Sequence, residues 1–214
     1  MDCTRKPVLW WFGPKGVVRG YENHMIELHT TTPDAWVKTV LGDFDAFLLD
    51  HAACERKASA MAMTFVVRYP DRGEIHDSMI QLAREELAHF HRVFRICKER
   101  GLVFSGDQKD PYVNGLLQLR RRGRNEEFLD RLIIAGVVEA RGHERFGCIA
   151  NALEEGPLKA FYDEITKSEE RHADIFIELA ALYFPMSEIQ QRLTLFVDAD
   201  AEICAGLPFR AALH

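Results

Sequence analysis

Four segments of this 214-residue chain carry apolar residues at alternating steps of four and three, and this spacing restricts the fold more than any other feature. The segments cover residues 44–69, 75–96, 128–153 and 158–183. Apolar residues at this spacing form one face of an α-helix. Four such helices can bury their apolar faces against one another, and we find no convincing strand run. The pattern therefore predicts an all-α protein built on a four-helix bundle.

Proline and glycine residues mark the limits of the predicted helices. Residues 1–31 read as an irregular arm, and the bundle is expected over residues 33–184, with a possible break in its first helix at Gly42. The connection over residues 101–124 is long enough to cross the length of the bundle between its second and third helices. A fifth helix is expected over residues 187–205. We expect one domain over residues 1–214.

The apolar face, or seam, of each of the four predicted helices is interrupted near its middle by carboxylate or imidazole side chains. A lone glutamate precedes a Glu-x-x-His pair by about 30 residues, and this arrangement occurs twice. Four carboxylates in a core cost several kcal/mol for each uncompensated ion, and two divalent metal ions would supply the compensating charge. Residues three apart share a helix face, so each pair can reach the same two metals. The predicted metal ligands are Glu55, Glu86, His89, Glu139, Glu169 and His172.

Two alternatives to this ligand set stay open at the level of sequence. The same residues can form buried Glu–His ion pairs without metal, although this leaves two glutamates unpaired. A rotation of a helix by one residue would exchange Glu86 for Glu85, or Glu169 for Glu170. Only the register of the apolar face and the i, i+3 spacing to the histidine favour Glu86 and Glu169. A carboxylate-rich, histidine-poor set favours two iron ions (Fe2+/Fe3+), with manganese as the alternative.

No catalytic residue is predicted beyond the metal ligands. His51 precedes Glu55 by one helical turn, and His143 follows Glu139 by one turn. Both are candidates for a supporting position behind a ligand, or for ordinary core histidines with hydrogen bonds.

The balance of charge is acidic overall but basic in places. Twenty-seven Lys and Arg against 33 Asp and Glu give a net charge of −6, which argues against a protein that coats nucleic acid. Basic residues nevertheless cluster in two segments. One is the first twenty residues, which also contain tryptophans, and the other is the long connection, which contains none. Arginines contact phosphates and aromatic rings stack on bases, so both segments are candidate RNA contacts. The candidates in the connection are Arg120, Arg121, Arg122 and Arg124.

The five cysteines are scattered and form no CxxC pair, which is typical of reduced thiols and excludes a zinc ribbon. The N-terminal residues lack the apolar run of a signal peptide, and no apolar stretch reaches about 18 residues. We therefore expect a cytoplasmic protein with neither a membrane nor DNA as a partner.

Four ligand-bearing segments resemble the tRNA hydroxylase family that acts on 2-methylthio-isopentenyl-adenosine. They are HAACERKAS (51–59), QLAREELAHFHRV (81–93), GVVEARGHERF (136–146) and KSEERHADIF (167–176). The resemblance implies a ferritin-like bundle with a non-haem di-iron centre at the six residues named above. It also implies an O2-dependent monooxygenase that hydroxylates the isopentenyl group beside the tRNA anticodon.

The same resemblance implies two further partners, tRNA through its anticodon loop and a reductase or other external two-electron donor that the sequence does not identify. The alternatives are a ferritin-like ferroxidase or iron-storage protein and a manganese catalase. The first would form a large hollow oligomer, and the second would contain manganese and turn over peroxide.

Overall fold

The computed structural model describes residues 25–106 and 109–214, and within them all regular structure is helical. Residues 1–24 of the predicted arm, including all of its first twenty residues with their tryptophans, lie outside the described residues, and residues 25–31 contain no helix. The elements are α1 (Asp34–Gly42), α2 (Phe44–Arg68), η1 (Gly73–Ile75), α3 (His76–Glu99), α4 (Pro111–Gln118), α5 (Arg124–Ala152), α6 (Pro157–Ala181) and α7 (Met186–Gly206). The predicted all-α fold is confirmed.

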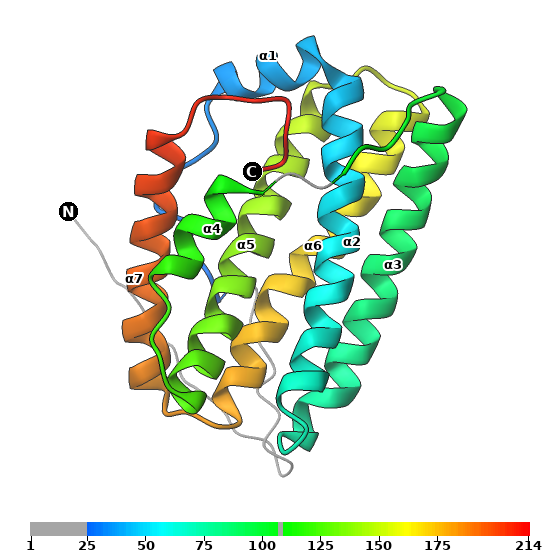
Figure 1. Cartoon of the computed structure of the whole chain (residues 1–214). Coiled ribbons are helices and arrows are strands. Elements are labelled where there is room, and N and C mark those ends of the chain that lie inside the picture. The colour runs from blue at the N-terminus through cyan, green and yellow to red at the C-terminus, as the bar shows by residue number, and fades with distance from the viewer. Residues whose placement is uncertain (1–24, 107–108) are drawn as a thin grey trace, which may run out of the picture.

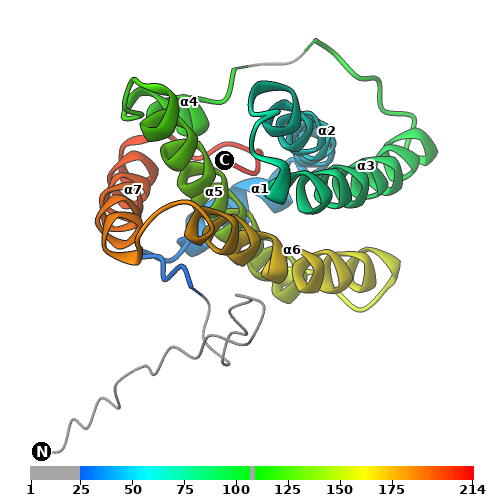
Figure 2. The ribbon, with the colours of Figure 1, turned by 90° about the horizontal axis from the view of Figure 1, so that it is seen from below.

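Two antiparallel helix pairs form the bundle, with α2 along α3 and α5 along α6 (Figure 1). The long connection between α3 and α5 contains α4, so it crosses the bundle as the sequence predicts. Figure 2 shows α7 on the outer side of α5, while α1 lies across one end of the bundle in Figure 1. The arrangement is a ferritin-like bundle with an added C-terminal helix.

Local chemistry explains where the helices begin and end. Asp43 caps α2 by accepting a hydrogen bond from the backbone N–H of Ala46 (3.2 Å), and this cap divides the first predicted helix into α1 and α2. Gly101 follows the end of α3 with a φ of 73°, a left-handed conformation that glycine adopts without a steric penalty. Asp110 caps α4 and is followed by Pro111 in its first turn.

The hydrophobic core is divided into two clusters by the layer of predicted ligands. One cluster contains Phe65, Leu82 and Phe176, and the other contains Phe47 and Phe146. The ligand layer therefore has apolar packing both above and below it along the bundle axis. This arrangement keeps water from the carboxylates and strengthens their electrostatic interactions.

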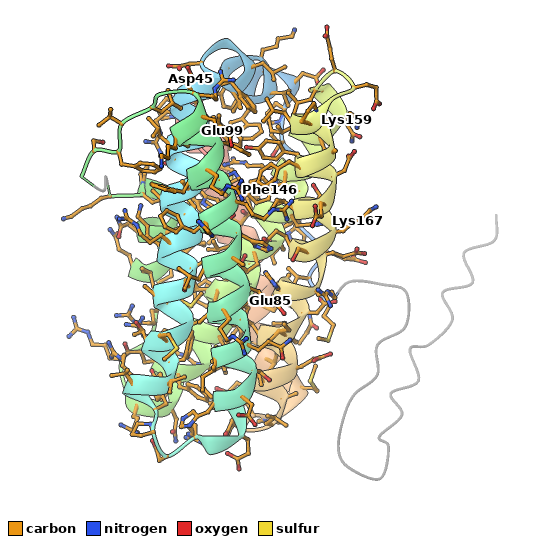
Figure 3. The ribbon with its side chains drawn as sticks, turned by 90° about the vertical axis from the view of Figure 1, so that its right-hand side faces the viewer. Asp45, Glu85, Glu99, Phe146, Lys159 and Lys167 are labelled. Atoms are coloured by element: carbon orange, nitrogen blue, oxygen red, sulfur yellow. The ribbon has the colours of Figure 1, made fainter. Side chains whose placement is uncertain are left out.

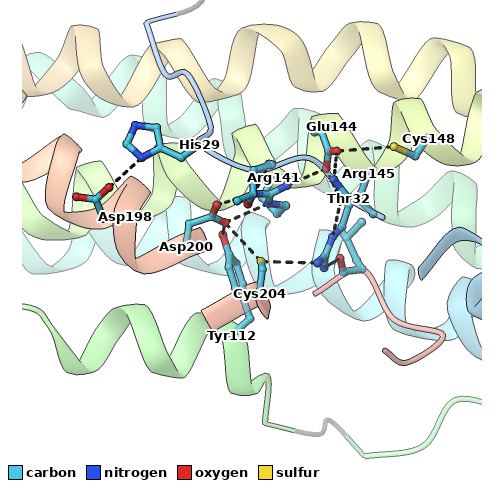
Figure 4. Close-up of polar contacts among 12 residues, drawn as sticks. His29, Thr32, Tyr112, Arg141, Glu144, Arg145, Cys148, Asp198, Asp200 and Cys204 are labelled. Carbon is cyan, nitrogen blue, oxygen red and sulfur yellow. Dashed lines mark hydrogen bonds and ion pairs between the residues drawn. The ribbon is translucent and has the colours of Figure 1, made fainter. Parts of the chain in front are cut away.

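A buried ion pair attaches α7 to the bundle (Figure 4). Arg141 of α5 donates to Asp200 of α7 from Nη2 (2.6 Å) and Nε (3.1 Å). The hydroxyl of Tyr112 in α4 donates to the same carboxylate (2.8 Å). Asp200 thus joins α4, α5 and α7. The apolar pattern of the sequence does not predict this contact, because the contact forms between residues of three different helices.

None of the helices in the described part of the chain is both long and apolar enough to span a membrane.

Candidate metal centre

The six predicted ligands come together in the middle of the bundle. Their donor atoms fall into two groups, and within each group all atoms lie within 4.8 Å of one another. Glu86 and Glu169 belong to both groups. The first group is completed by Glu55 and His89 and the second by Glu139 and His172. This is the arrangement of two adjacent cation sites that share two carboxylates.

The helical spacing places each Glu-x-x-His pair on one face, as expected from residues three apart. The Nδ1 atom of His172 lies 2.9 Å from Oε2 of Glu169 on its own helix and 2.7 Å from Oε1 of Glu86 on α3. The Nδ1 atom of His89 lies 3.0 Å from Oε1 of Glu169 and 3.5 Å from Oε2 of Glu55. Each imidazole therefore faces carboxylates from two helices or more.

Unpaired donor atoms test whether these residues fit a metal. Glu55 Oε2, Glu86 Oε1, His89 Nδ1 and Glu169 Oε1 are buried and have no hydrogen-bond partner among the described residues. Some of these atoms lie within 3.0 Å of another donor atom of the cluster but do not have the alignment of a hydrogen bond. They converge on the same small regions between the helices. Buried polar atoms are nearly always paired in proteins, and ligation of cations accounts for this set. The donor set fits a pair of divalent metals.

The pKa values of the cluster show how strongly its charges interact. Burial raises the pKa of Glu139 well above its usual range, and the Glu86 and Glu169 carboxylates raise it further. Burial lowers the pKa of His172, but its contacts with Glu169 and Glu86 outweigh this and raise the value to about 12. A positive charge beside these carboxylates is therefore strongly favoured, which divalent metals provide with neutral imidazoles.

Two residues contact the ligands from outside the cluster. Fully buried His51 lies 2.7 Å from Oε1 of Glu55 through Nε2, and 3.1 Å from the hydroxyl of Tyr162 through Nδ1. The other residue is Glu85, which Figure 3 labels on α3. Its Oε2 lies 2.9 Å from Nε2 of His172. These contacts resemble the outer partners that orient metal ligands.

The structure thus assigns different positions to Glu85 and its neighbour Glu86. Glu86 faces the cluster and is 1% exposed, whereas the side chain of Glu85 is 32% exposed and reaches the far nitrogen of His172. The contact of Glu85 with His172 was not expected from the sequence. The position of Glu85 directly before the predicted ligand Glu86 was the only sequence feature that could have indicated it.

His143, one helical turn after Glu139, contacts the backbone of the neighbouring helix. Its Nδ1 is 2.9 Å from the backbone carbonyl oxygen of Thr166, so it links α5 to α6. Like His51 it belongs to neither ligand group, whereas His51 contacts the predicted ligand Glu55 directly.

The arginines of the long connection are mostly paired with acids. Arg121 binds buried Asp130 (3.0 Å) and Glu188 (3.1 Å), and thereby ties the connection to α5 and α7. Arg120 and Arg124 pair with Glu127 and Asp71 respectively. Arg122 is exposed and has no acidic partner within ion-pair distance in the described part of the chain. Of the four predicted RNA contacts, Arg122 is therefore the one without an acidic partner among the described residues.

Comparison with solved structures finds a neighbour of known activity. The structure matches "Protein 43 with aldehyde deformylating oxygenase activity from Synechococcus" with a TM-score of 0.83 and 30% sequence identity. The match covers 87% of this chain and 94% of that chain. The neighbour has a ferritin-like fold, in agreement with the bundle described above.

Comparison of sequences finds two relatives that share one name, tRNA 2-(methylsulfanyl)-N(6)-isopentenyladenosine(37) hydroxylase. The protein from Pseudomonas putida is 34% identical over 172 residues, which cover 80% of this chain and 83% of the relative. The protein from Salmonella typhimurium is 26% identical over an alignment of 225 positions, which covers 82% of this chain and 83% of the relative. The family model for tRNA-(MS[2]IO[6]A)-hydroxylase (MiaE) matches residues 21–214. This chain belongs to that tRNA hydroxylase family.

Proposed function

We propose that this protein hydroxylates the isopentenyl group of 2-methylthio-isopentenyl-adenosine in tRNA. In this proposal two iron ions are bound by the six residues predicted above, O2 is the co-substrate, and an external donor supplies two electrons. Support comes from the buried cluster of four carboxylates and two imidazoles, in a chain whose relatives carry the name of this hydroxylase. The observation that carries the proposal is the presence of two ligand groups that share Glu86 and Glu169.

Each ligand has a distinct place in the proposed centre. Glu86 and Glu169 would contact both ions, since both ligand groups contain them. Glu55 with His89 would complete one site, and the remaining glutamate and histidine of the cluster would complete the other. When bound, the iron pair supplies the redox chemistry that activates O2 for insertion into an unreactive C–H bond.

The protein's own contribution is to orient the ligands and to exclude water. The side chain of His51 is placed to donate from Nε2 to Glu55, and this fixes the orientation of that carboxylate. Burial lowers the pKa of His51 to about 3, so the ring is neutral at neutral pH and its other nitrogen, Nδ1, can accept from Tyr162. The apolar clusters on both sides keep bulk water from the reacting group. The modified base must leave the anticodon stack to bring its prenyl group to such a site.

The test is turnover with defined metal and substrate. Metal-free protein is loaded with Fe(II) without oxygen, its metal content is measured, and tRNA bearing the modified base is added with reductant and O2. We expect the hydroxylated nucleoside in a digest of the tRNA. Glu86→Gln should lower the iron content below two ions per chain and abolish the product, while Glu99→Gln, an exposed change on the same helix, should keep both the iron content and the product. An iron-replete preparation that consumes O2 but leaves the nucleoside unmodified would refute the proposal.

A further inference from the structure

The helix α3 carries a second stripe of regularly spaced residues on the side away from the ligands. Its members follow one another at steps of four and three, so they lie on one helix face. Apolar and basic side chains alternate along it. The outer stripe consists of Ile80, Arg84, Leu87, His91, Phe94 and Lys98, all of them exposed. Leu87 is 54% exposed and Ile80 is 40% exposed, so the stripe places apolar surface in contact with solvent.

The basic members of this outer stripe have no acidic partners in the described part of the chain. Among residues 25–106 and 109–214, no carboxylate lies within ion-pair distance of Arg84 or Lys98. Other arginines of the same helix are paired, since Arg92 binds Glu164 at 2.7 Å. The outer stripe therefore presents uncompensated positive charge together with apolar surface, a combination found in protein interfaces.

This stripe is also close to the metal ligands. Glu86 and His89 lie on the inner face of α3, and Leu87 and His91 follow them on its outer face. The diameter of a helix with its side chains is about 10–12 Å, so only the thickness of α3 separates the stripe from the cluster. In Figure 3, α3 lies in front, and the connection that follows it meets the stripe at Phe94, on whose ring Phe104 stacks with centroids 5.5 Å apart. The helices α4 and α7 cover the opposite side of the bundle in Figure 1.

We infer that the outer stripe of α3 is the docking surface for an acidic, one-electron donor protein of the iron–sulfur ferredoxin class. The inference rests on the proposed function, which requires electrons from outside. Hydroxylation of a C–H bond consumes O2, two electrons and two protons, and it yields the alcohol and one water. A one-electron carrier must therefore bind and leave twice in each cycle. Positive charge around an apolar contact suits such brief encounters, because attraction between opposite charges speeds association.

Other occupants fit this stripe less well. A second copy of the chain, placed with its own stripe against this one, would bring Arg84 and Lys98 near identical cations. RNA binding relies on stacking and phosphate contacts, and among the apolar members only Phe94 has a ring. An acidic protein surface with apolar residues complements both the charge and the apolar character of the stripe.

The first test measures binding without reference to turnover. The probe is an acidic plant-type [2Fe–2S] ferredoxin, titrated against the protein at several salt concentrations. We expect an affinity that falls with salt, and a loss of at least tenfold in Arg84→Glu/Lys98→Glu and in Leu87→Glu. The control, Leu195→Glu with Lys38→Glu, changes one exposed apolar residue and one exposed cation elsewhere and should bind like the wild type. Equal affinity of all variants, or no binding by the wild type, would overturn the inference.

The second test separates this inference from the proposed function. Hydroxylation is measured with reduced ferredoxin and, in parallel, with dithionite and a small viologen mediator. The α3 variants should lose at least tenfold in rate with ferredoxin and keep the wild-type rate with the mediator. If no product forms with either reductant while the binding differences remain, the docking surface stands and the proposed function fails. If the α3 variants bind tRNA more weakly and ferredoxin as well as the wild type does, the stripe is an RNA contact and the inference is overturned. If they lose a dimer that the wild type forms, the stripe contacts a second copy of the chain and the inference is likewise overturned.

Discussion

Glu85 shows how a residue one position away from a proposed ligand can act on the metal centre indirectly. Its carboxylate contacts Nε2 of His172, while Nδ1 of the same ring faces Glu86 and Glu169. A carboxylate at Nε2 keeps a proton on that nitrogen and leaves Nδ1 as the nitrogen that can bind a cation. Glu85 is therefore expected to set both the orientation and the tautomer of His172.

The substitution Glu85→Gln should weaken one iron site and spare the other. Loss of an outer partner typically costs 10–100-fold in metal affinity. We expect this loss for the ion bound by His172, because glutamine can turn its amide toward Nε2 and cease to be a reliable acceptor. Equilibrium dialysis against Fe(II) under anaerobic conditions measures both sites. Glu99→Gln is the control, since Glu99 lies on the same helix and is exposed. Two unchanged affinities would show that Glu85 does not support His172.

The predictability of individual residues follows from the range of the interaction involved. The six cluster residues are predictable because a helix fixes which side chains share a face, and each seam points to the same interior. The pairing of Arg121 with Asp130 and Glu188 is not predictable in this way. It depends on how the connection folds back onto α5 and α7, and a count of charges along the chain cannot show it. From the sequence alone, the arginine cluster was therefore interpreted as a basic patch without acidic partners.

Among the elements, α7 depends most clearly on one buried ion pair. Asp200 is fully buried and accepts from Arg141 and from Tyr112. Its partner in α5 lies 59 positions away along the chain, so neither the seam spacing nor a helix-capping pattern indicates the contact. The existence of α7 was predictable from its amphipathic pattern, but its attachment was not.

The substitution Asp200→Ala should destabilise the protein by about 3 kcal/mol, because it leaves the buried Arg141 charge with Glu144 as its remaining acidic partner (3.0 Å). The double variant Arg141→Met/Asp200→Leu should recover most of this loss, since two apolar side chains replace both charges. Urea denaturation of the three proteins measures the free energy of unfolding. A double variant as unstable as Asp200→Ala would show that the network contributes more than charge compensation.

The helix α4 provides a prediction for the dependence of stability on pH. Burial by itself raises the pKa of Asp110, but its contact with His214 and hydrogen bonds from backbone N–H groups at the start of α4 lower it from 3.8 to about 2. A carboxylate with a lowered pKa in the folded state stabilises the fold above its unfolded pKa. This stabilisation, about 2 kcal/mol, is lost as the pH falls from about 4 toward 2.

Asp110→Asn isolates this charge, because asparagine still caps a helix. At pH 7 the variant should be less stable than the wild type by about 1–2 kcal/mol, and the difference should shrink as the pH approaches 2.5. Urea denaturation at a series of pH values measures the difference. A gap between the two proteins that is constant over this range would assign the effect to side-chain geometry and exclude the charge.

At the scale of the whole molecule, the proposed metals would link the two helix pairs of the bundle. One pair supplies Glu55, Glu86 and His89, and the other supplies the remaining three cluster residues. The donor atoms of both pairs must lie close together for ions to bind, so binding favours the folded bundle over the unfolded chain. An ion present at a hundred times its dissociation constant adds about 2.7 kcal/mol of stability.

Glu139→Leu should therefore change stability in opposite directions with and without iron. In metal-free protein the buried Glu139 carboxyl faces other carboxylates, and burial with their charges raises its pKa well above its usual range. Leucine of similar volume removes that cost, so the metal-free variant should be more stable than the wild type by about 1–3 kcal/mol. Anaerobic calorimetry with and without Fe(II) should then show a large rise in Tm for the wild type and at most half of it for the variant. Glu126→Gln, an exposed change on the same helix, should leave both values near those of the wild type. If metal-free Glu139→Leu is less stable than the metal-free wild type, Glu139 stabilises the fold even without metal. The predicted cost of burying this carboxyl in the metal-free protein would then be wrong.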